Sequence, residues 1–104
     1  MTTQAYTNEA VTLLAHLIAT PSVSRDERRA ADIIQEALTR YGFTPQREAN
    51  NVWAIGHHYN EARPTLLLNA HLDTVKPVST YTRNPYEPSL EEGILYGLGS
   101  NDCG

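Results

Sequence analysis

The sequence of residues 66–75 is LLLNAHLDTV, and this stretch decides how the fold of the chain is interpreted. Its unbroken run of three leucines predicts a strand over residues 65–70 that is covered on both faces. Such a strand belongs in the middle of the sheet of a layered α/β domain. The run leads directly to His71 and Asp73, so the predicted strand delivers an imidazole and a carboxylate at its end.

The composition is that of an ordinary globular domain. The chain has 104 residues, of which 40% are hydrophobic and 19% charged, and its net charge is -4. No basic patch is visible, so we expect neither nucleic acid nor a membrane as a partner. No apolar run approaches the roughly 20 residues of a membrane-spanning helix, and no signal peptide opens the chain. The single cysteine, Cys103, fits a reducing compartment, and we expect a cytoplasmic protein.

Two helices are predicted ahead of the leucine run. The first should extend from about residue 8 to residue 19, because Val11, Leu14 and Ile18 share one face of it, and Pro21 should end it.

The second helix is expected to begin with a capping box, in which the Ser24 hydroxyl and the Glu27 carboxylate each satisfy a backbone amide. Gly42 should end this helix as a left-handed cap. Its buried face is expected to carry Ala31, Ile34, Leu38 and Tyr41.

Two hairpins are predicted around the central strand. The first joins residues 43–48 and 52–57 through the turn pair Asn50-Asn51. In the second, Glu91-Glu92-Gly93 turns into residues 94–96. The fold class that follows is α/β, with two helices and a mixed sheet.

Several other segments are expected to carry no site. Residues 76–88 are rich in Pro, Ser, Thr, Asn and Tyr and should form a surface loop. Trp53 should lie in the core, and His16 at the boundary of its helix. His57-His58 should point to opposite faces of a hairpin strand, and Cys103 should serve small-residue packing.

The pair His71 and Asp73 carries the first chemical signal. In an extended chain both side chains point to the same side, roughly 6.6 Å apart along the strand. A metal-bound imidazole usually donates its free N–H to a carboxylate or carbonyl, and Asp73 can orient His71 in this way. A second carboxylate, Asp102, lies among the glycines of residues 97–104, which let the backbone bend sharply. Taken singly, these features also fit a satisfied polar pair and a glycine-rich turn.

Taken together, residues 66–75 and 96–102 resemble a family of di-zinc hydrolases in motif, order and spacing. This family comprises acetylornithine deacetylase, succinyl-diaminopimelate desuccinylase, carboxypeptidase G and aminoacylase. Its members carry an apolar strand into His-x-Asp-(Thr/Val), followed by a Tyr-Gly-x-Gly-x-x-Asp loop. The junction at residues 18–24, with Glu27 after it, is also similar. The form Gly-Ser-Asn-Asp at residues 99–102 is most similar to a branch of the acetylornithine deacetylases.

The resemblance implies a site and a cofactor. His71 would be a ligand of one zinc, Asp102 the carboxylate that bridges two zincs, and Asp73 the catalytic residue that holds the imidazole of His71. Two zinc ions, for which cobalt can substitute, would polarise the scissile carbonyl and hold hydroxide as the nucleophile. The resemblance also implies a cis peptide bond between Asp102 and Cys103.

The resemblance further implies a larger protein. Residues 1–104 would be the N-terminal portion of a three-layer zinc-exopeptidase-like catalytic domain. The general base, the remaining ligands and a lid domain that forms a homodimer would lie downstream of Gly104. The expected reaction is cleavage of the acyl amide of an N-acyl amino acid, with N-acetylornithine as the first choice of substrate. The isolated piece should be inactive.

Two other functions stay open. The substrate of a di-zinc hydrolase can instead be a dipeptide or a succinylated diamine. Leu98 and Gly104 stand where many members have Arg and Lys, and this departure bears on the substrate more than on the metal. The alternative from another class is a noncatalytic α/β binding module, in which His71 and Asp102 merely satisfy the core.

Overall fold

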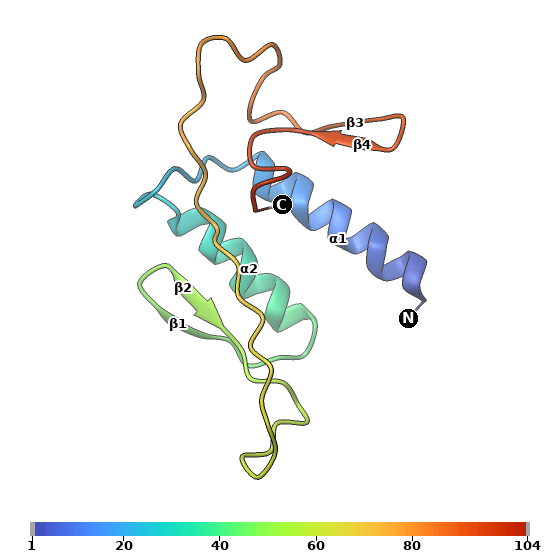
Figure 1. The fold of residues 1–104 in the computed structure, drawn as a ribbon, viewed down its shortest axis with the longest axis vertical. Helices are drawn as coiled ribbons and strands as arrows, with labels where there is room; N and C mark the ends of the chain where they lie inside the picture. Colours follow the sequence, from blue (N-terminus) through green and yellow to red (C-terminus); the bar gives the residue numbers. More distant parts are fainter. Residues whose placement is uncertain (1, 104) are drawn as a thin grey trace.

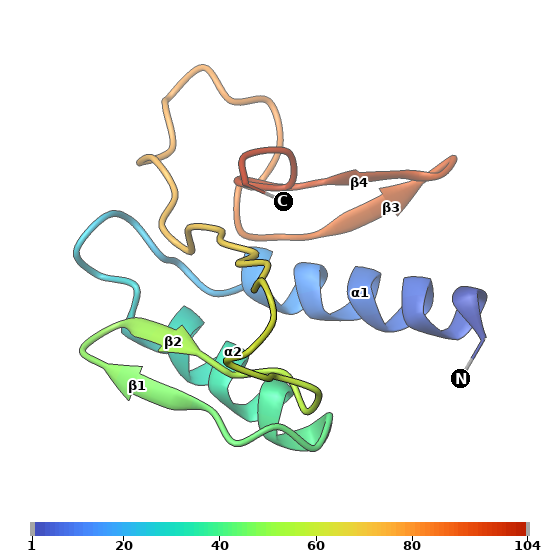
Figure 2. The same cartoon turned by 60° about the horizontal axis from the view of Figure 1, so that its bottom comes forward.

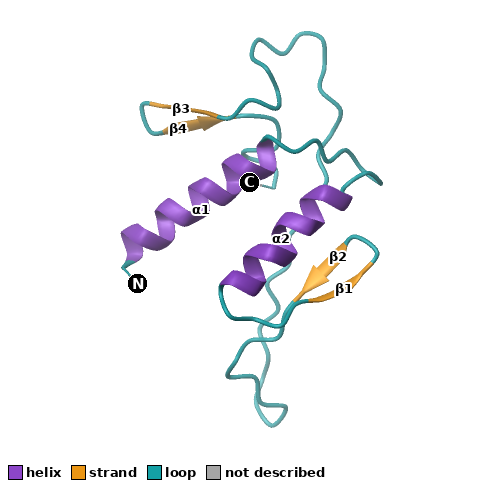
Figure 3. Cartoon of the chain, turned by 180° about the vertical axis from the view of Figure 1, so that it is seen from behind, coloured by secondary structure: helices purple, strands orange, loops and turns teal. Residues whose placement is uncertain are grey.

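The computed structural model describes residues 2–103, which form two helices and two separate antiparallel hairpins (Figure 1). The elements are α1 (Thr3–Ile18), α2 (Arg28–Arg40), β1 (Gln46–Glu48), β2 (Asn51–Trp53), β3 (Ser89–Glu91) and β4 (Ile94–Tyr96). The β1–β2 hairpin lies along α2, and the β3–β4 hairpin lies on the side of α1 (Figures 2 and 3). The α/β class is therefore confirmed, whereas the expected mixed sheet is replaced by two two-stranded sheets in the described chain. Neither described helix is long and apolar enough to cross a membrane.

Helix α1 begins at Thr3, earlier than the predicted residue 8. The reason is an N-terminal cap, since the hydroxyl of Thr2 accepts a hydrogen bond from the Ala5 amide at 3.1 Å. The helix ends at Ile18, ahead of Pro21 as predicted. Ile18 is its buried residue, and the other two residues of the predicted face are only half-buried.

The predicted capping box at the start of α2 is wrong. The helix begins at Arg28, with Glu27 rather than Ser24 at the cap position, and no side chain caps its first turn. Arg25 adopts a left-handed conformation with φ 72°, so the chain turns between Ser24 and the helix. The Ser24 hydroxyl therefore stands too early in the chain to reach the amides of the first turn.

The end of α2 is formed as predicted. Gly42 has φ 85°, and its amide donates to the carbonyl of Thr39 at 3.0 Å. The amide of Phe43 donates to the carbonyl of Leu38, also at 3.0 Å. This pair of bonds is a Schellman motif, which satisfies carbonyls that the helix leaves free.

The core is smaller than the hydrophobic pattern predicts. Tyr41 and Trp53, both expected in the core, are 41% and 42% exposed, and Ile34 and Leu38 are half-buried. Trp53 lies in a sheet of only two strands, and such a sheet has too few strands to enclose a large aromatic side chain. No large side chain within residues 2–103 is fully buried. The buried residues are Ile18, Ser22, Ala30, Ala31 and Ala37.

Both predicted hairpins are present, although each strand is short. In β1–β2, Glu48 pairs with Asn51, so the turn falls on Ala49 and Asn50, one residue earlier than predicted. In β3–β4, the two turn residues have positive φ, 51° at Glu92 and 78° at Gly93. Positive φ at both turn positions is the type I′ geometry that matches the twist of a hairpin.

Arg47 joins the first hairpin to α2. Its guanidinium forms an ion pair with Asp32 and a hydrogen bond at 3.1 Å to Oε1 of Gln35. The same side chain donates to the carbonyl of Ala49 at 2.8 Å. One arginine therefore fixes both the turn of the hairpin and its position on the helix.

Residues 65–70 do not form the predicted buried strand. Leu66, Leu67 and Leu68 are 81%, 81% and 85% exposed, and this yellow segment of Figure 1 carries no strand assignment. A buried strand needs neighbours that pair with its backbone and cover its side chains, and nothing between residues 2 and 103 does so here. Residues 76–88 form a surface loop, as predicted.

The contact between Gly97 and Ile18 gives a test of this packing. A Cβ at Gly97 would lie 2.4 Å from Cγ2 of Ile18, so we expect Gly97→Ala to lower the free energy of unfolding by about 1–3 kcal/mol. Urea unfolding of the chain measures the effect. Gly56→Ala is the matched control, because a Cβ at Gly56 meets nothing within 4 Å. Equal losses in the two variants would contradict the packing described.

Candidate functional site

Ser22 anchors residues 71–75 to the end of α1. Its hydroxyl donates to the carbonyl of Leu72 at 3.0 Å, and its carbonyl accepts from the amide of Thr74 at 2.8 Å. A parallel bridge between Val23 and Thr74 continues this contact. Ser22 is only 4% exposed, so these bonds are shielded from water. The backbone is thus fixed on both sides of Asp73.

The glycine loop brings Asp102 to the same place. A Cβ at Gly99 would lie 2.7 Å from Cγ2 of Thr74, so only glycine permits this approach. The amide of Leu98 donates to the carbonyl of Pro85 at 2.9 Å, which ties the loop to the preceding surface loop. The peptide bond that follows Asp102 is cis, as the family resemblance implied.

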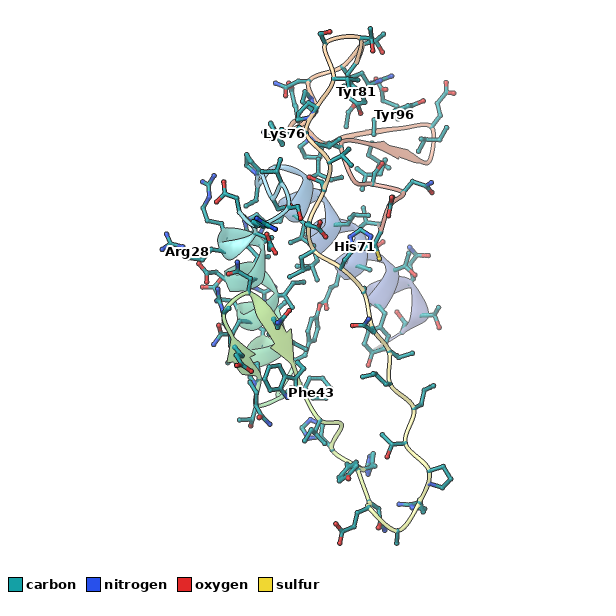
Figure 4. The ribbon with its side chains drawn as sticks, turned by 60° about the vertical axis from the view of Figure 1, so that its left-hand side comes forward. Arg28, Phe43, His71, Lys76, Tyr81 and Tyr96 are labelled. Carbon is teal, nitrogen blue, oxygen red and sulfur yellow. The ribbon has the colours of Figure 1, made fainter. Side chains whose placement is uncertain are left out.

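His71 connects the two segments. Its Nε2 lies 2.9 Å from Oδ1 of Asp102. Its Nδ1 lies 3.0 Å from the backbone oxygen of Asp73 and 3.3 Å from Oδ1 of the same residue. Figure 4 shows His71 beside the C-terminal loop. The three residues that the sequence singled out therefore meet, and the carbonyl of Asp73 is closer to the imidazole than its carboxylate is.

This arrangement requires a proton or a cation between the imidazole and Asp102. A backbone oxygen only accepts hydrogen bonds, so Nδ1 must carry a proton to bond Asp73. In the neutral imidazole, Nε2 then presents a lone pair to the carboxylate of Asp102. Two acceptors at 2.9 Å are held together by a proton shared between Nε2 and the carboxyl group or by a cation between them.

The pKa of His71 follows from these contacts. The hydrogen bond to Asp102 raises it above the usual histidine range, and the bond to the Asp73 carbonyl adds to the effect. Half of the imidazole surface is exposed to solvent. Without a metal, the imidazolium is therefore the favoured partner of the carboxylate.

The donors fit part of a zinc site. Imidazole nitrogen and carboxylate oxygen both bind zinc at roughly 2.0–2.2 Å, which places two donors of one tetrahedral ion roughly 3.3 Å apart. His71 and Asp102, at 2.9 Å, are already close to that spacing. A catalytic zinc usually has three protein ligands. Residues 2–103 contain no group of three or more His, Cys, Asp or Glu side chains that could hold an ion.

The three residues line an open cleft of about 820 Å³. The sequence analysis assigned no role in a site to the other polar residues of its wall, which are scattered along the chain. Four of them lie in the segments that resemble the family, at residues 18–24, 66–75 and 96–102, whereas Lys76 and Tyr81 lie in the predicted surface loop. The polar residues that line the cleft beside the motif are Ser24, Thr74, Lys76, Tyr81, Ser100 and Asn101.

The remaining histidines and the cysteine lie outside this network. His57 and His58 occupy a turn after β2 rather than the predicted strand, and His57 stacks on Phe43 with ring centroids 4.7 Å apart. His16 is exposed on α1. Cys103 is also exposed, so the expectation that it packs among small residues is wrong. It follows the cis bond directly.

The raised pKa of His71 gives a second test. Asp102→Asn should lower this pKa toward the ordinary value of about 6.5, because it removes the carboxylate that stabilises the imidazolium. The pKa is raised on folding, so the contact stabilises the fold below the unfolded pKa and is lost as pH rises through the folded pKa. An NMR titration of the imidazole measures the shift. Glu36→Gln, an exposed change on α2, is the control, and equal curves for both variants would contradict the contact.

Comparison with known proteins points to the same chemistry. The chain is 32% identical over 101 residues to the succinyl-diaminopimelate desuccinylase of Xylella fastidiosa (strain M23). It is 30% identical over 103 residues to that of Anaplasma marginale (strain Florida), and 32% over 96 residues to that of Stenotrophomonas maltophilia (strain R551-3). These matches cover 91%, 91% and 86% of this chain, but only 26%, 26% and 25% of the relatives.

The chain therefore spans about a quarter of the length of the curated relatives that it matches. No family model matches the chain. The likeness to the three desuccinylases nevertheless supports the zinc hydrolase family that the His-x-Asp and glycine-loop motifs resemble.

Proposed function

We propose that the protein containing these residues is a zinc-dependent hydrolase that cleaves the acyl amide of N-acyl amino acids. In this proposal, residues 1–104 are the N-terminal portion of its catalytic domain. One observation carries the proposal: His71 is held between two acceptors, the carbonyl of Asp73 and the carboxylate of Asp102. A bound metal ion satisfies this arrangement without protonating the imidazole.

Each of the three residues has a separate role. The backbone oxygen of Asp73 accepts a hydrogen bond from the Nδ1–H group of His71. This bond fixes the tautomer and directs Nε2 into the cleft. His71 and Asp102 would then hold zinc, with Asp102 free to bridge two ions through its two oxygens. When bound, zinc or the substituting cobalt would polarise the scissile carbonyl and lower the pKa of a water. The remaining ligands and the general base would come from chain outside residues 1–104.

The relatives favour a succinylated substrate over an acetylated one. All three are named succinyl-diaminopimelate desuccinylase, so the alternative of a desuccinylase fits them better than N-acetylornithine does. The acetylornithine expectation rests on residues 99–102 alone. We therefore propose an N-succinyl amino acid as the substrate. A cytoplasmic homodimer, formed through a lid domain, completes the proposal.

The full-length protein loaded with zinc tests this function. It should hydrolyse N-succinyl-diaminopimelate faster than N-acetylornithine. His71→Ala and Asp102→Ala should each remove a zinc ligand and lower kcat/KM by about a thousandfold or more. Asp73→Asn should cost only about tenfold, because the backbone oxygen that bonds the imidazole remains.

His58→Ala is the control, since His58 lies outside the cleft and should leave kcat/KM at the wild-type value. Zinc content is measured in parallel on every variant. A full-length protein that binds no zinc and hydrolyses neither substrate would favour the noncatalytic binding module instead.

The isolated 104-residue chain should be inactive. It offers two zinc donors at one place, fewer than the three that a catalytic zinc usually needs. We expect no turnover with added zinc or cobalt and a zinc affinity weaker than micromolar, measured by calorimetric titration. Turnover by this chain would overturn the proposed division of the site between residues 1–104 and the rest of the protein.

A further inference from the structure

Lys76 is the one permanently cationic side chain that lines the cleft. The other charged groups there are the carboxylates of Asp73 and Asp102, together with the titratable imidazole of His71. Figure 4 shows Lys76 and Tyr81 at the same end of the molecule, on the loop that rises beyond His71. The lining of the cleft therefore combines the proposed zinc-binding residues with one cation, Lys76.

A fixed backbone segment connects Lys76 to His71. Lys76 follows Thr74 by two residues, and Thr74 is bonded to Ser22 at 2.8 Å. Pro77 comes next, which restricts Lys76 to an extended conformation. Lys76 is five positions after His71, so their Cα atoms lie at most about 18 Å apart, and both residues line the same cleft.

Lys76 is also available for a ligand. Arg83, the other cation of residues 76–88, forms an ion pair with Glu91 at 2.8 Å. Its guanidinium also lies 3.7 Å from the centroid of the Tyr96 ring. Lys76 makes no ion pair with any residue in the described part of the chain. The guanidinium of Arg83 is thus occupied by contacts within the fold, whereas Lys76 lines the cleft without an ion-pair partner in the described chain.

The charges of the cleft discriminate between acyl groups. An acetyl group is neutral beyond its carbonyl and needs no cation. A succinyl group ends in a free carboxylate, which an ammonium group in the same cleft stabilises. The ammonium group of Lys76 can donate a charge-assisted hydrogen bond to such a carboxylate, and the phenol hydroxyl of Tyr81 can donate a second one.

We propose that Lys76, assisted by the hydroxyl of Tyr81, binds the terminal carboxylate of a dicarboxylic acyl group and so selects succinyl over acetyl substrates. This inference rests on the proposed function and deepens it. Lys76 acts on the remote end of the acyl group, away from the scissile amide. It is therefore a specificity residue, and its loss should appear mainly in KM.

The test compares N-succinyl and N-acetyl derivatives of the same amino acid on the zinc-loaded, full-length protein. Lys76→Met keeps the length of the side chain and removes its charge, and it should lower the succinyl-to-acetyl ratio of kcat/KM about tenfold. Lys76→Arg restores the charge and should recover most of the ratio. Arg63→Met removes an exposed cation that does not line the cleft and should leave the ratio at the wild-type value.

The outcomes separate the two proposals. Hydrolysis of N-acyl amino acids with the same ratio in Lys76→Met and wild type overturns the role of Lys76 and leaves the proposed function standing. An equal loss on both substrates also overturns it, because it assigns Lys76 to the α-carboxylate that the substrates share. A wild-type protein that binds zinc but hydrolyses neither derivative overturns the proposed function, and the selection of an acyl group falls with it.

Discussion

The site depends on the backbone contact between Ser22 and residues 72–74. Two hydrogen bonds, at 2.8 and 3.0 Å, hold this segment against the chain that leaves α1. Residues 64–70, just before it, are fully exposed and unpaired within the described chain. Ser22 therefore fixes the backbone at the point where the chain, unpaired up to residue 70, presents His71 and Asp73 to the site. A buried hydroxyl with a backbone partner is worth far more here than an exposed one, because water does not compete for it.

Two glycines complete the same junction from the other side. Gly97 packs against Ile18, the last residue of α1, and Gly99 packs against Thr74, which Ser22 holds. Both approaches leave no room for a Cβ. The end of α1 is thus the common support of the histidine segment and of the Asp102 loop. Residues 31 positions apart in the chain meet at 2.9 Å because each is tied to that support.

The sequence predicted two turns whose causes are local, although the equally local capping box of α2 was wrong. The Gly42 cap and the Glu92-Gly93 turn depend on positive φ at a few adjacent residues, and both are present. The central strand at residues 65–70 and the burial of Trp53 were wrong, because burial depends on partners that no local pattern specifies. The meeting of His71 with Asp102 was predicted only through the family motif. Lys76 was missed, since a lysine in a loop has no pattern that places it in a cleft.

The proposed function gives one physical explanation for three features of the described chain: exposed leucines, an unpaired backbone segment and an incomplete set of zinc ligands. The leucines of residues 66–68 lack covering side chains, and the backbone around them lacks a neighbouring strand within the described residues. The proposed zinc donors His71 and Asp102 lack a third ligand in the same range. A sheet neighbour beside residues 65–70 would supply the first two, and strands that end at the same sheet edge as His71 would carry further ligands to it. A fold that buries the leucines would therefore also complete the proposed metal site, and the two requirements constrain each other.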